Sequence, residues 1–206
     1  MVDFDVERGM YGSHGAVRPA VGRGSAQSPD YCLRGHRLQI AGVTGRYSHY
    51  YRLTDITCEV CYALKDPLAT WYLIDPTEQY SAEDADTMGL VLVLIPPAMR
   101  GGLGHIELWL GGVSVGDIDL RACGPCRRAV LEHVRVDEKY RRMGYGRVLV
   151  AAAVARAPGY SWSTTTMDTS LATRAFWAAV GDQVPGDIGG PPNYCTDMLR
   201  AAEHTP

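Results

Sequence analysis

The residues best suited to binding a charged ligand lie between a predicted strand and a predicted helix. Residues 131–136 alternate in polarity with a period of two, which is typical of a β-strand. Residues 147–156 are rich in alanine, lack internal glycine and proline, and are followed by Pro158-Gly159, so they predict a helix. The connection between the two combines glycines with arginines, and its residues are Arg141, Arg142, Met143, Gly144, Tyr145, Gly146 and Arg147.

A loop of this composition has the chemistry of a phosphate-binding site. The first N–H groups of a helix have no intrahelical partner, and the helix dipole adds positive potential at the same end. Glycine lets the backbone approach a ligand closely, and arginine adds formal charge. We therefore expect residues 141–147 to bind a phosphate, and a pyrophosphate in particular. The alternative is that Gly144 and Gly146 simply end the strand while the arginines are solvated.

Glu132 is the residue of the predicted strand best suited to acid–base chemistry. A carboxylate next to an anion site can take a proton from a reacting group. The alternation predicts that Glu132 shares a face with Val134 and Val136, whereas His133 lies on the opposite face. A solvated surface carboxylate is the alternative interpretation.

The cysteines form two pairs with the spacing of metal ligands. Cys58-x-x-Cys61 and Cys123-x-x-Cys126 supply four thiolates, the number found in a structural zinc site. We expect one tetrahedral zinc site if the pairs meet in space, and four ordinary thiols if they do not. The remaining cysteines are interpreted as isolated features, namely Cys32 with His36, and Cys195.

The segment Cys123-Gly-Pro-Cys126 also resembles the redox motif of thioredoxin. In that motif a thiolate at a helix N-terminus is the nucleophile. The residue before the first cysteine is Ala122 rather than an aromatic residue, and the pattern after Cys126 has a period nearer two than 3.6. A thiol–disulfide oxidoreductase is therefore an alternative function rather than the main prediction.

Two motifs resemble those of the GNAT superfamily of N-acetyltransferases. The spacing Val-x-x-x-Tyr-Arg-x-x-Gly-x-Gly is similar to the acetyl-CoA loop of that family and is formed by Val136, Tyr140, Arg141, Gly144 and Gly146. Downstream, Ser-x-x-Thr-x-x-Phe-Trp-x-x-x-Gly resembles a degraded form of the family's next helix and is formed by Ser170, Thr173, Phe176, Trp177 and Gly181. The resemblance covers residues 104–181.

The resemblance implies an acetyl-CoA site and a role for the strand and the loop. The loop from Arg141 to Arg147 would hold the pyrophosphate. The backbone of Val134 and Val136 would supply N–H donors to the thioester carbonyl, where negative charge develops during transfer. Glu132 would be the base that removes a proton from the amine, with His105 and Glu107 as weaker alternatives.

The second motif implies contacts to the rest of the cofactor. Ser170 stands where the family usually has Asn and would hydrogen-bond the pantetheine arm. Trp177 stands where a Tyr often protonates the departing thiolate, and an indole N–H is a donor but not a workable acid. Water or Tyr194 would then serve, or the thiolate would leave unaided, or the protein would bind CoA without efficient turnover.

The predicted elements agree with the mixed α/β (α+β) fold that the resemblance implies, a mostly antiparallel sheet flanked by helices with an atypical N-terminal extension. Gly111-Gly112 predicts a hairpin turn. Only residues 96–103 separate the expected strand at 90–95 from the next one, where the family usually has one or two helices. The first family strand is therefore either 90–95 or a segment near Arg37. From residue 90 onward the expected strands are 90–95, 105–110, 113–120, 127–136, 160–166 and 194–199, and a further helix is expected at 170–180.

We divide the chain into a Gly/Ser-rich disordered arm over residues 1–30 and a single GNAT-like domain over residues 31–206. Within that domain, 31–86 is an atypical cysteine-containing part and 87–206 is the acetyl-CoA-binding core. The atypical part is expected to contain a strand at 37–41, a helix or strand at 54–64 and a strand at 71–74.

Composition limits the classes of function. The chain has 206 residues and a formal net charge of −3, which argues against nucleic-acid binding. No apolar run approaches the length that crosses a membrane, and no secretion signal is apparent, so we expect a cytoplasmic protein with no membrane partner. Exposed strand edges make a homodimer a plausible assembly.

The sequence thus predicts an acetyl-CoA-dependent N-acetyltransferase that acts by direct attack of an amine on the thioester. The acceptor is either a small molecule or a protein amine. The alternatives are the oxidoreductase above and a non-catalytic interaction protein that binds CoA or zinc.

Overall fold

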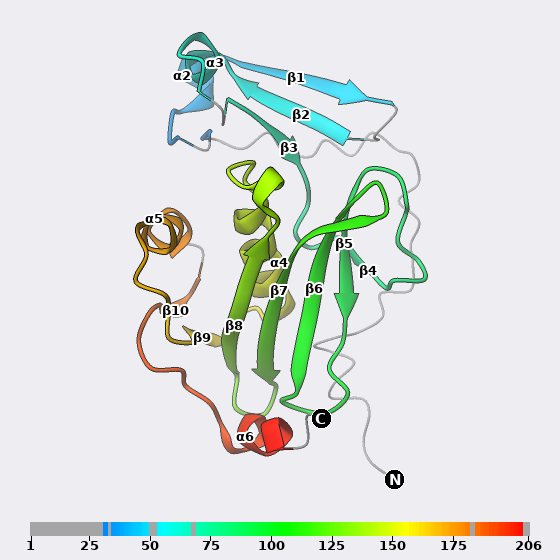
Figure 1. Cartoon of the computed structure of the whole chain (residues 1–206), viewed down its shortest axis with the longest axis vertical. Coiled ribbons are helices and arrows are strands. Elements are labelled where there is room, and N and C mark those ends of the chain that lie inside the picture. The colour runs from blue at the N-terminus through cyan, green and yellow to red at the C-terminus, as the bar shows by residue number, and fades with distance from the viewer. Residues whose placement is uncertain (1–30, 33, 50–52, 67–68, 182–183, 204–206) are drawn as a thin grey trace.

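The computed structural model describes residues 31–32, 34–49, 53–66, 69–181 and 184–203, and the predicted arm over residues 1–30 lies outside them. The described chain forms a small sheet near its beginning and a larger sheet with flanking helices (Figure 1). Within these ranges, the helices are too short or too polar to cross a membrane.

The small sheet is antiparallel, with strand order β1-β2-β3. Its strands are β1 (Val43–Ser48), β2 (Leu53–Cys58) and β3 (Thr70–Leu73), and two short helices, α2 (Leu38–Ala41) and α3 (Glu59–Ala63), lie at one end of it (Figure 1). We call residues 31–73 the N-terminal lobe. Its buried core is small and includes three thiols, and it consists of Cys32, Leu38, Ile56, Cys58, Cys61, Ala69 and Trp71.

The sequence predictions for this lobe are partly wrong. Residues 38–41 form helix α2 instead of a strand, and Gly42 ends the helix with a φ of +78°, a conformation that favours glycine. The ambiguous segment 54–64 divides into the end of β2 and helix α3. The strand expected at 71–74 is confirmed as β3.

The large sheet has seven strands among the described residues, in the order β10-β9-β8-β7-β6-β5-β4. Its central strands are antiparallel, whereas β9 pairs parallel with β8, and β4 pairs parallel with β5. The strands are β4 (Gln79–Tyr80), β5 (Leu90–Ile95), β6 (Leu103–Leu110), β7 (Val113–Cys123), β8 (Arg128–Val136), β9 (Ser161–Thr164) and β10 (Gly186–Asp187).

Three longer helices accompany this sheet. They are α4 (Tyr145–Arg156), α5 (Leu171–Val180) and α6 (Thr196–Glu203), and a 3₁₀ turn at Glu138–Tyr140 precedes α4. Helix α4 lies behind the sheet in Figure 1, α5 lies beside β8, and α6 lies at the end of the sheet near the β7–β8 turn.

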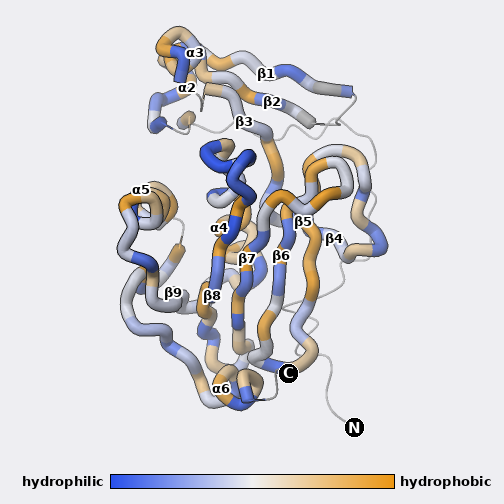
Figure 2. The backbone as a smooth tube through the Cα atoms, viewed as in Figure 1, coloured by the Kyte–Doolittle hydropathy of each residue, from blue (hydrophilic) through white to orange (hydrophobic). Residues whose placement is uncertain are grey.

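The main core lies between α4 and one face of the large sheet. The fully buried side chains of Ile106 and Leu120 pack there with Leu149 and Ala153 of the helix. Burial of apolar side chains is the main favourable term in folding. Here it fixes α4 against β6, β7 and β8. Figure 2 shows hydrophobic stretches along these strands and a strongly hydrophilic loop just before α4.

The opposite face of the large sheet is polar, and we call it the polar face. It carries His105 and Glu107 of β6 together with Asp117, Asp119 and Arg121 of β7, which alternate with the core residues. Helix α6 covers only the end of this face, where Met198 and Cys195 pack on Cys123 and Val130.

Several predictions for the large sheet are confirmed. The hairpin of β6 and β7 turns at Gly111 and Gly112, whose φ angles are +62° and +77°. The expected strand at 90–95 is β5, the antiparallel neighbour of β6, whereas Arg37 lies in the N-terminal lobe and outside this sheet. Residues 96–102 join β5 to β6 without a helix.

The last predicted strand is wrong. Residues 196–203 form helix α6, in which Met198 and Ala201 are buried. Together with Cys195, these buried residues recur every three positions, which is a helical spacing rather than the period of two expected of a strand.

Candidate active site

Strand β9 pairs along its whole length, but only with the beginning of β8. Residues 128–131 of β8 are in register with 161–164 of β9, and β8 then continues to Val136. The last links between them come from Thr165, whose N–H bonds the carbonyl of Leu131 at 3.0 Å and whose hydroxyl bonds the carbonyl of Glu132 at 2.8 Å. Beyond Glu132, the outer edge of β8 has no strand partner in the described part of the chain.

The unpaired edge of β8 presents backbone donors. The N–H of Asp137 bonds the carbonyl of Val115 in β7 at 3.0 Å. Because successive residues of a strand direct their N–H groups to opposite sides, the N–H groups of Val134 and Val136 point away from β7. These are the two residues that the sequence predicted as backbone donors.

A β-bulge at Glu132 contradicts the predicted alternation of faces. Asp119 pairs with His133, and the next residue, Leu120, pairs with Leu131, so Glu132 has no partner in β7. Glu132 therefore lies with His133 on the polar face, whereas Val134 packs against the main core. The predicted alternation assumed that β8 has no bulge. The extra residue in β8 moves every later side chain of the strand to the opposite face from the one predicted.

Both carboxylate oxygens of Glu132 are hydrogen-bonded. Arg121 donates its Nε–H to Oε1 at 2.9 Å, and Tyr194 donates its hydroxyl to Oε2 at 2.8 Å. Arg121 also donates to the carbonyl of Gly101 at 3.4 Å. Glu132 is thus held between β7 and the segment that leads into α6.

Tyr194 remains protonated over the physiological pH range. Burial, the hydrogen bond to Glu132 and the negative charge of that carboxylate raise its pKa to about 12. A tyrosine held in this state can donate a proton, and it lies beside the residue predicted to be the base. The sequence analysis named Tyr194 as an alternative acid, but nothing in the sequence indicated that it lies next to Glu132.

Helix α4 begins directly after the loop predicted to bind a phosphate. Gly144 is its N-cap with a φ of +84°, and no side chain caps the helix. The first intrahelical bond joins the N–H of Val148 to the carbonyl of Gly144, so the N–H groups of Tyr145, Gly146 and Arg147 precede it. The helix starts two residues earlier than the sequence predicted.

The loop arginines have different surroundings. Arg141 and Arg142 are exposed, and Arg141 donates to the carbonyl of Val136 at 3.0 Å, which ties the loop to the end of β8. Arg142 has a φ of +66°. Arg147 donates to the carbonyl of Ala179 at 3.0 Å and thereby joins α4 to α5. Met143 is also exposed, so the loop presents both charge and apolar surface.

Helix α5 packs against the start of α4. Phe176 lies so close to Gly146 that a Cβ at that position would be 2.7 Å from its ring. Trp177 packs edge to face on Phe176, with ring centroids 5.2 Å apart, and contacts the main core. Ser170 caps α5 by accepting the N–H of Thr173 at 3.2 Å. The absence of a side chain at Gly146 therefore allows α5 to pack closely on α4, in addition to any role in ligand binding.

A comparison with known protein families agrees with this arrangement. Residues 65–181 match the sequence model of the acetyltransferase (GNAT) family. The chain belongs to the GNAT acetyltransferase family. This assignment covers the unpaired edge of β8, the glycine loop and the first turn of α4, and it confirms the resemblance found in the sequence. Members of this family normally use acetyl-CoA as the acetyl donor.

A search of curated proteins found no match. Among solved structures, the chain is similar to an aminoglycoside acetyltransferase from an uncultured soil metagenomic sample, in complex with sisomicin. The two chains are 16% identical, the TM-score is 0.35, and the similarity covers 47% of this chain and 67% of the other.

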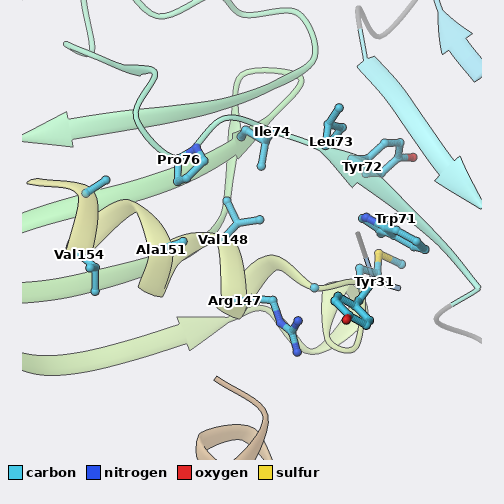
Figure 3. Close-up of a pocket in the computed structure, with 13 residues that line it drawn as sticks. Tyr31, Trp71, Tyr72, Leu73, Ile74, Pro76, Arg147, Val148, Ala151 and Val154 are labelled. Carbon is cyan, nitrogen blue, oxygen red and sulfur yellow. The ribbon is translucent and has the colours of Figure 1, made fainter. Parts of the chain in front are cut away.

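Several features of this GNAT domain fit a nucleotide-bearing ligand near α4. A cavity of about 430 Å³ lies between the helix and the N-terminal lobe. Figure 3 shows Tyr31 and Trp71 of the lobe beside Arg147 at one end of it, and Ile74 over Val148 farther along α4. Two members of the loop, Met143 and Gly144, also line it. The donor set and the apolar walls suit a phosphate attached to an aromatic base.

A buried hydroxyl in the same region has no hydrogen-bond partner among the described residues. It belongs to Tyr145, the first residue of α4, whose ring stacks on Tyr72 with centroids 6.4 Å apart. Burial raises the pKa of Tyr145, so it stays neutral and can serve as a donor. The N-terminal lobe thus contributes side chains close to the predicted cofactor loop, a contribution that the sequence analysis did not foresee.

The polar face of the GNAT sheet carries a second hydrogen-bonded acid–base group. His105 contacts Asp119 through Nδ1 at 2.5 Å and Glu107 through Nε2 at 3.3 Å. Burial lowers the pKa of His105, but the hydrogen bond to Asp119 and the charges of Asp119, Asp117 and Glu107 outweigh burial, so the pKa is raised overall. The sequence named His105 and Glu107 only as weaker alternatives to Glu132.

The two cysteine pairs do not meet, and the predicted zinc site of Cys58, Cys61, Cys123 and Cys126 is wrong in its composition. The first pair lies in the N-terminal lobe, where it gathers with Cys32 and His36. The second pair lies at the turn between β7 and β8, where it gathers with Cys195. Each pair therefore gains its further neighbours from elsewhere in the chain, and the spacing of the cysteines in the sequence did not indicate these neighbours.

Cys123-Gly-Pro-Cys126 forms the turn of a hairpin. Cys123 ends β7, and Cys126 is exposed two residues before β8 begins. The thioredoxin resemblance requires a helix after the second cysteine, and a strand follows instead. Burial raises the pKa of the Cys123 thiol to about 12, which opposes the formation of a nucleophilic thiolate.

Proposed function

We propose that this protein transfers the acetyl group of acetyl-CoA to an amine by direct attack of the amine on the thioester. The observation that carries the proposal is the unpaired edge of β8 next to the uncapped start of α4. That edge directs the N–H groups of Val134 and Val136 outward, and α4 adds three further N–H groups and a set of arginines. Acetyl-CoA, when bound, supplies the activated acetyl group.

In this proposal, the loop and the first turn of α4 hold the pyrophosphate. The N–H groups of Gly146 and Arg147 and the exposed guanidinium of Arg142 provide hydrogen bonds and positive charge. Arg141 holds the loop against Val136, so its role combines charge with positioning. The cavity beside Trp71 has apolar and aromatic walls and takes the adenine ring.

The N–H groups of Val134 and Val136 stabilise the negative charge that develops on the thioester oxygen. They belong to a strand that is fixed on its other edge by β7, so they need no reorganisation as charge develops. Fixed donors of this kind are worth about 3–4 kcal/mol each in comparable acyl-transfer sites. Because the donors are backbone groups, side-chain substitutions test them only indirectly.

Glu132 and Tyr194 divide the proton transfers in this mechanism. Glu132 takes the proton that the amine loses, directly or through water, and Tyr194 gives its hydroxyl proton to the departing thiolate. The proton on Glu132 then passes along the existing 2.8 Å hydrogen bond to the Tyr194 oxygen, which restores both residues. Once Glu132 is protonated, its charge no longer raises the pKa of Tyr194, which makes the tyrosine a better acid at the required moment.

The acceptor approaches from the polar face in this proposal. Glu132, Glu107 and Asp119 lie on that face, and carboxylates attract a protonated amine. His105 is the second candidate base, because its contact with Asp119 orients the ring and raises its pKa. Small-molecule amines and protein amines both satisfy this chemistry.

The test is a turnover assay with acetyl-CoA and a panel of polyamines, amino sugars and lysine-containing peptides. Release of free CoA thiol should depend on one class of amine, and mass spectrometry should find the acetylated product. The Cys123→Ser variant should keep this activity. Absence of acetyl-CoA turnover, together with a disulfide-reductase activity that Cys123→Ser abolishes, would favour the oxidoreductase instead.

A further inference from the structure

Four side chains with metal-binding atoms converge inside the N-terminal lobe. Cys32, His36, Cys58 and Cys61 each place one sulfur or nitrogen within 4.8 Å of the others. The three cysteines are buried, and no disulfide joins them. Nothing in the acetyl-transfer chemistry requires this group, since the reacting part of the molecule is built from β8, α4 and the segment before α6.

The separations match the edges of a tetrahedral zinc site. With Zn–S bonds of about 2.3 Å and Zn–N bonds of about 2.0 Å, two sulfurs would lie about 3.8 Å apart, and a sulfur and a nitrogen about 3.5 Å apart. The sulfurs of Cys32 and Cys61 are 3.8 Å apart. The Nδ1 atom of His36 lies 3.4 Å from the sulfur of Cys32, 3.2 Å from that of Cys61 and 3.8 Å from that of Cys58.

Neither a disulfide nor apolar packing of thiols accounts for these distances. A disulfide requires sulfurs about 2.05 Å apart and pairs an even number of cysteines. Apolar packing alone would not direct a histidine ring nitrogen toward all three sulfurs. Three thiols and one imidazole are a donor set that zinc prefers, and four protein ligands leave no open position, which is typical of a structural site.

The backbone around Cys32 and His36 is arranged to hold the ligands in place. The N–H of Cys32 bonds the carbonyl of His36 at 2.9 Å, and Gly35 allows the tight turn between them with a φ of +81°. The N–H groups of Arg34 and His36 point at the sulfur of Cys32, at 3.3 and 3.2 Å. Such outer hydrogen bonds orient metal ligands and are a regular feature of metal sites.

The second half of the site is fixed by β2 and α3. Cys58 ends β2, and Cys61 lies within α3, so the strand-to-helix junction brings both sulfurs to the same side. An ion pair joins the two halves, because Arg34 donates to Asp66 at 2.8 Å and the N–H of Asp66 bonds the carbonyl of Cys61 at 2.9 Å.

The size of the lobe also indicates a need for a metal. Domains of roughly 40 residues or fewer usually require disulfides, metals or partners, because they bury too little surface. The N-terminal lobe is close to this size, and three of its seven buried core residues are cysteines. Several of its large apolar side chains are exposed, among them Ile40, Tyr62 and Leu64.

We propose that Cys32, His36, Cys58 and Cys61 bind one Zn²⁺ ion in a closed tetrahedral site that holds the N-terminal lobe together. The imidazole binds through Nδ1, the atom that faces the sulfurs. The ion secures the lobe that carries Trp71 and Tyr72, which line the cavity beside α4. The other cysteine group offers only three ligands among the described residues, and one of them, Cys126, is exposed.

The first experiment measures zinc in the full-length protein, purified without chelator, together with two variants. We expect about one equivalent in the wild type, and its loss in Cys58→Ser. Cys126→Ser is the matched control, because it removes a thiol from the other cysteine group and should keep the metal. Absence of zinc from wild-type protein reconstituted with Zn²⁺, or loss of the metal in Cys126→Ser but not in Cys58→Ser, would overturn the proposal.

A second measurement keeps all three cysteines of the site in place. Wild-type protein loaded with Co²⁺ should show the absorption of a tetrahedral ion bound by three thiolates and one nitrogen. The His36→Cys variant keeps four ligands, and its spectrum should change to that of four thiolates. An unchanged spectrum in His36→Cys, or an octahedral spectrum in the wild type, would contradict the assigned ligands.

Discussion

The hydroxyl of Tyr194 donates a hydrogen bond of 2.8 Å to Glu132, although the two residues are 62 positions apart in the chain. Arg121 binds the other oxygen of the same carboxylate at 2.9 Å. The β-bulge at Glu132 makes this contact possible, because it directs the side chain to the polar face just where β8 and β9 separate. The proposed base and the proposed acid therefore share one hydrogen bond beside the predicted thioester site.

Replacing Glu132 by Gln should slow turnover and leave acetyl-CoA affinity close to wild type. The amide keeps the size of the side chain but cannot take a proton, and general bases typically contribute about 10²–10⁴-fold to rate. Steady-state kinetics with the acceptor found in the amine panel would measure the effect. Full activity in Glu132→Gln, with strong loss in His105→Gln, would transfer the role of base to His105.

Tyr194→Phe should also lower kcat, and it should change the response to alkali. The raised pKa of Tyr194 means that the native state keeps a proton which the unfolded state loses above its usual pKa of about 10. The free energy of unfolding should therefore fall as pH rises from 10 toward 12. Denaturant titrations at several pH values should show a smaller fall in Tyr194→Phe, and an equal fall in both proteins would contradict the assignment.

The contact of His105 with Asp119 predicts a second pH dependence, in which the folded state favours the charged form of the group. Because the folded pKa of His105 is raised, its stabilising contribution is complete below about pH 6.5 and is lost as pH rises through the folded pKa. Asp119→Asn should cost roughly 1 kcal/mol or less at pH 5.5, because the pair is partly exposed. The cost should shrink at pH 9, and an equal cost at both values would show that the pair is not charged.

Gly146→Ala should destabilise the contact between α4 and α5. The new Cβ would lie 2.7 Å from the ring of Phe176, and overpacking of this kind costs about 1–3 kcal/mol, against a helix-propensity gain of about 1 kcal/mol. Combining it with Phe176→Leu should recover part of the loss. Thermal or denaturant unfolding of the two single variants and the double variant provides the measurement, and purely additive effects would show that the two positions do not interact.

The parts of the fold with strong local signals were predictable. Gly111-Gly112 indicated the hairpin correctly, and the alanine-rich run indicated α4 to within two residues. These signals depend on local backbone preference and periodicity, which act over a few residues. The last strand was wrong, because Met198 and Ala201 follow a helical spacing that the short apolar segment 194–199 did not reveal.

The arrangement of the candidate site was predictable only in part. The loop and the unpaired strand edge follow from one continuous stretch of sequence, so the motif was sufficient to locate them. The partners of Glu132 come from β7 and from the segment before α6, and the β-bulge that exposes it has no signature in the residue types. The cysteine groups likewise depend on Cys32, His36 and Cys195, whose proximity to the pairs arises only from the tertiary fold.

The most direct test is a calorimetric titration of the full-length protein with acetyl-CoA, comparing wild type, Gly144→Ala and Gly111→Ala. Both glycines have a positive φ, so each alanine should cost roughly 1–2 kcal/mol of stability. Only Gly144 caps the helix of the proposed site, while a Cβ at Gly111 meets nothing within 4 Å. We expect saturable binding in the wild type and in Gly111→Ala, and at least tenfold weaker binding in Gly144→Ala. No binding to the wild type, or equal binding by all three, would contradict the proposed acetyl-CoA site.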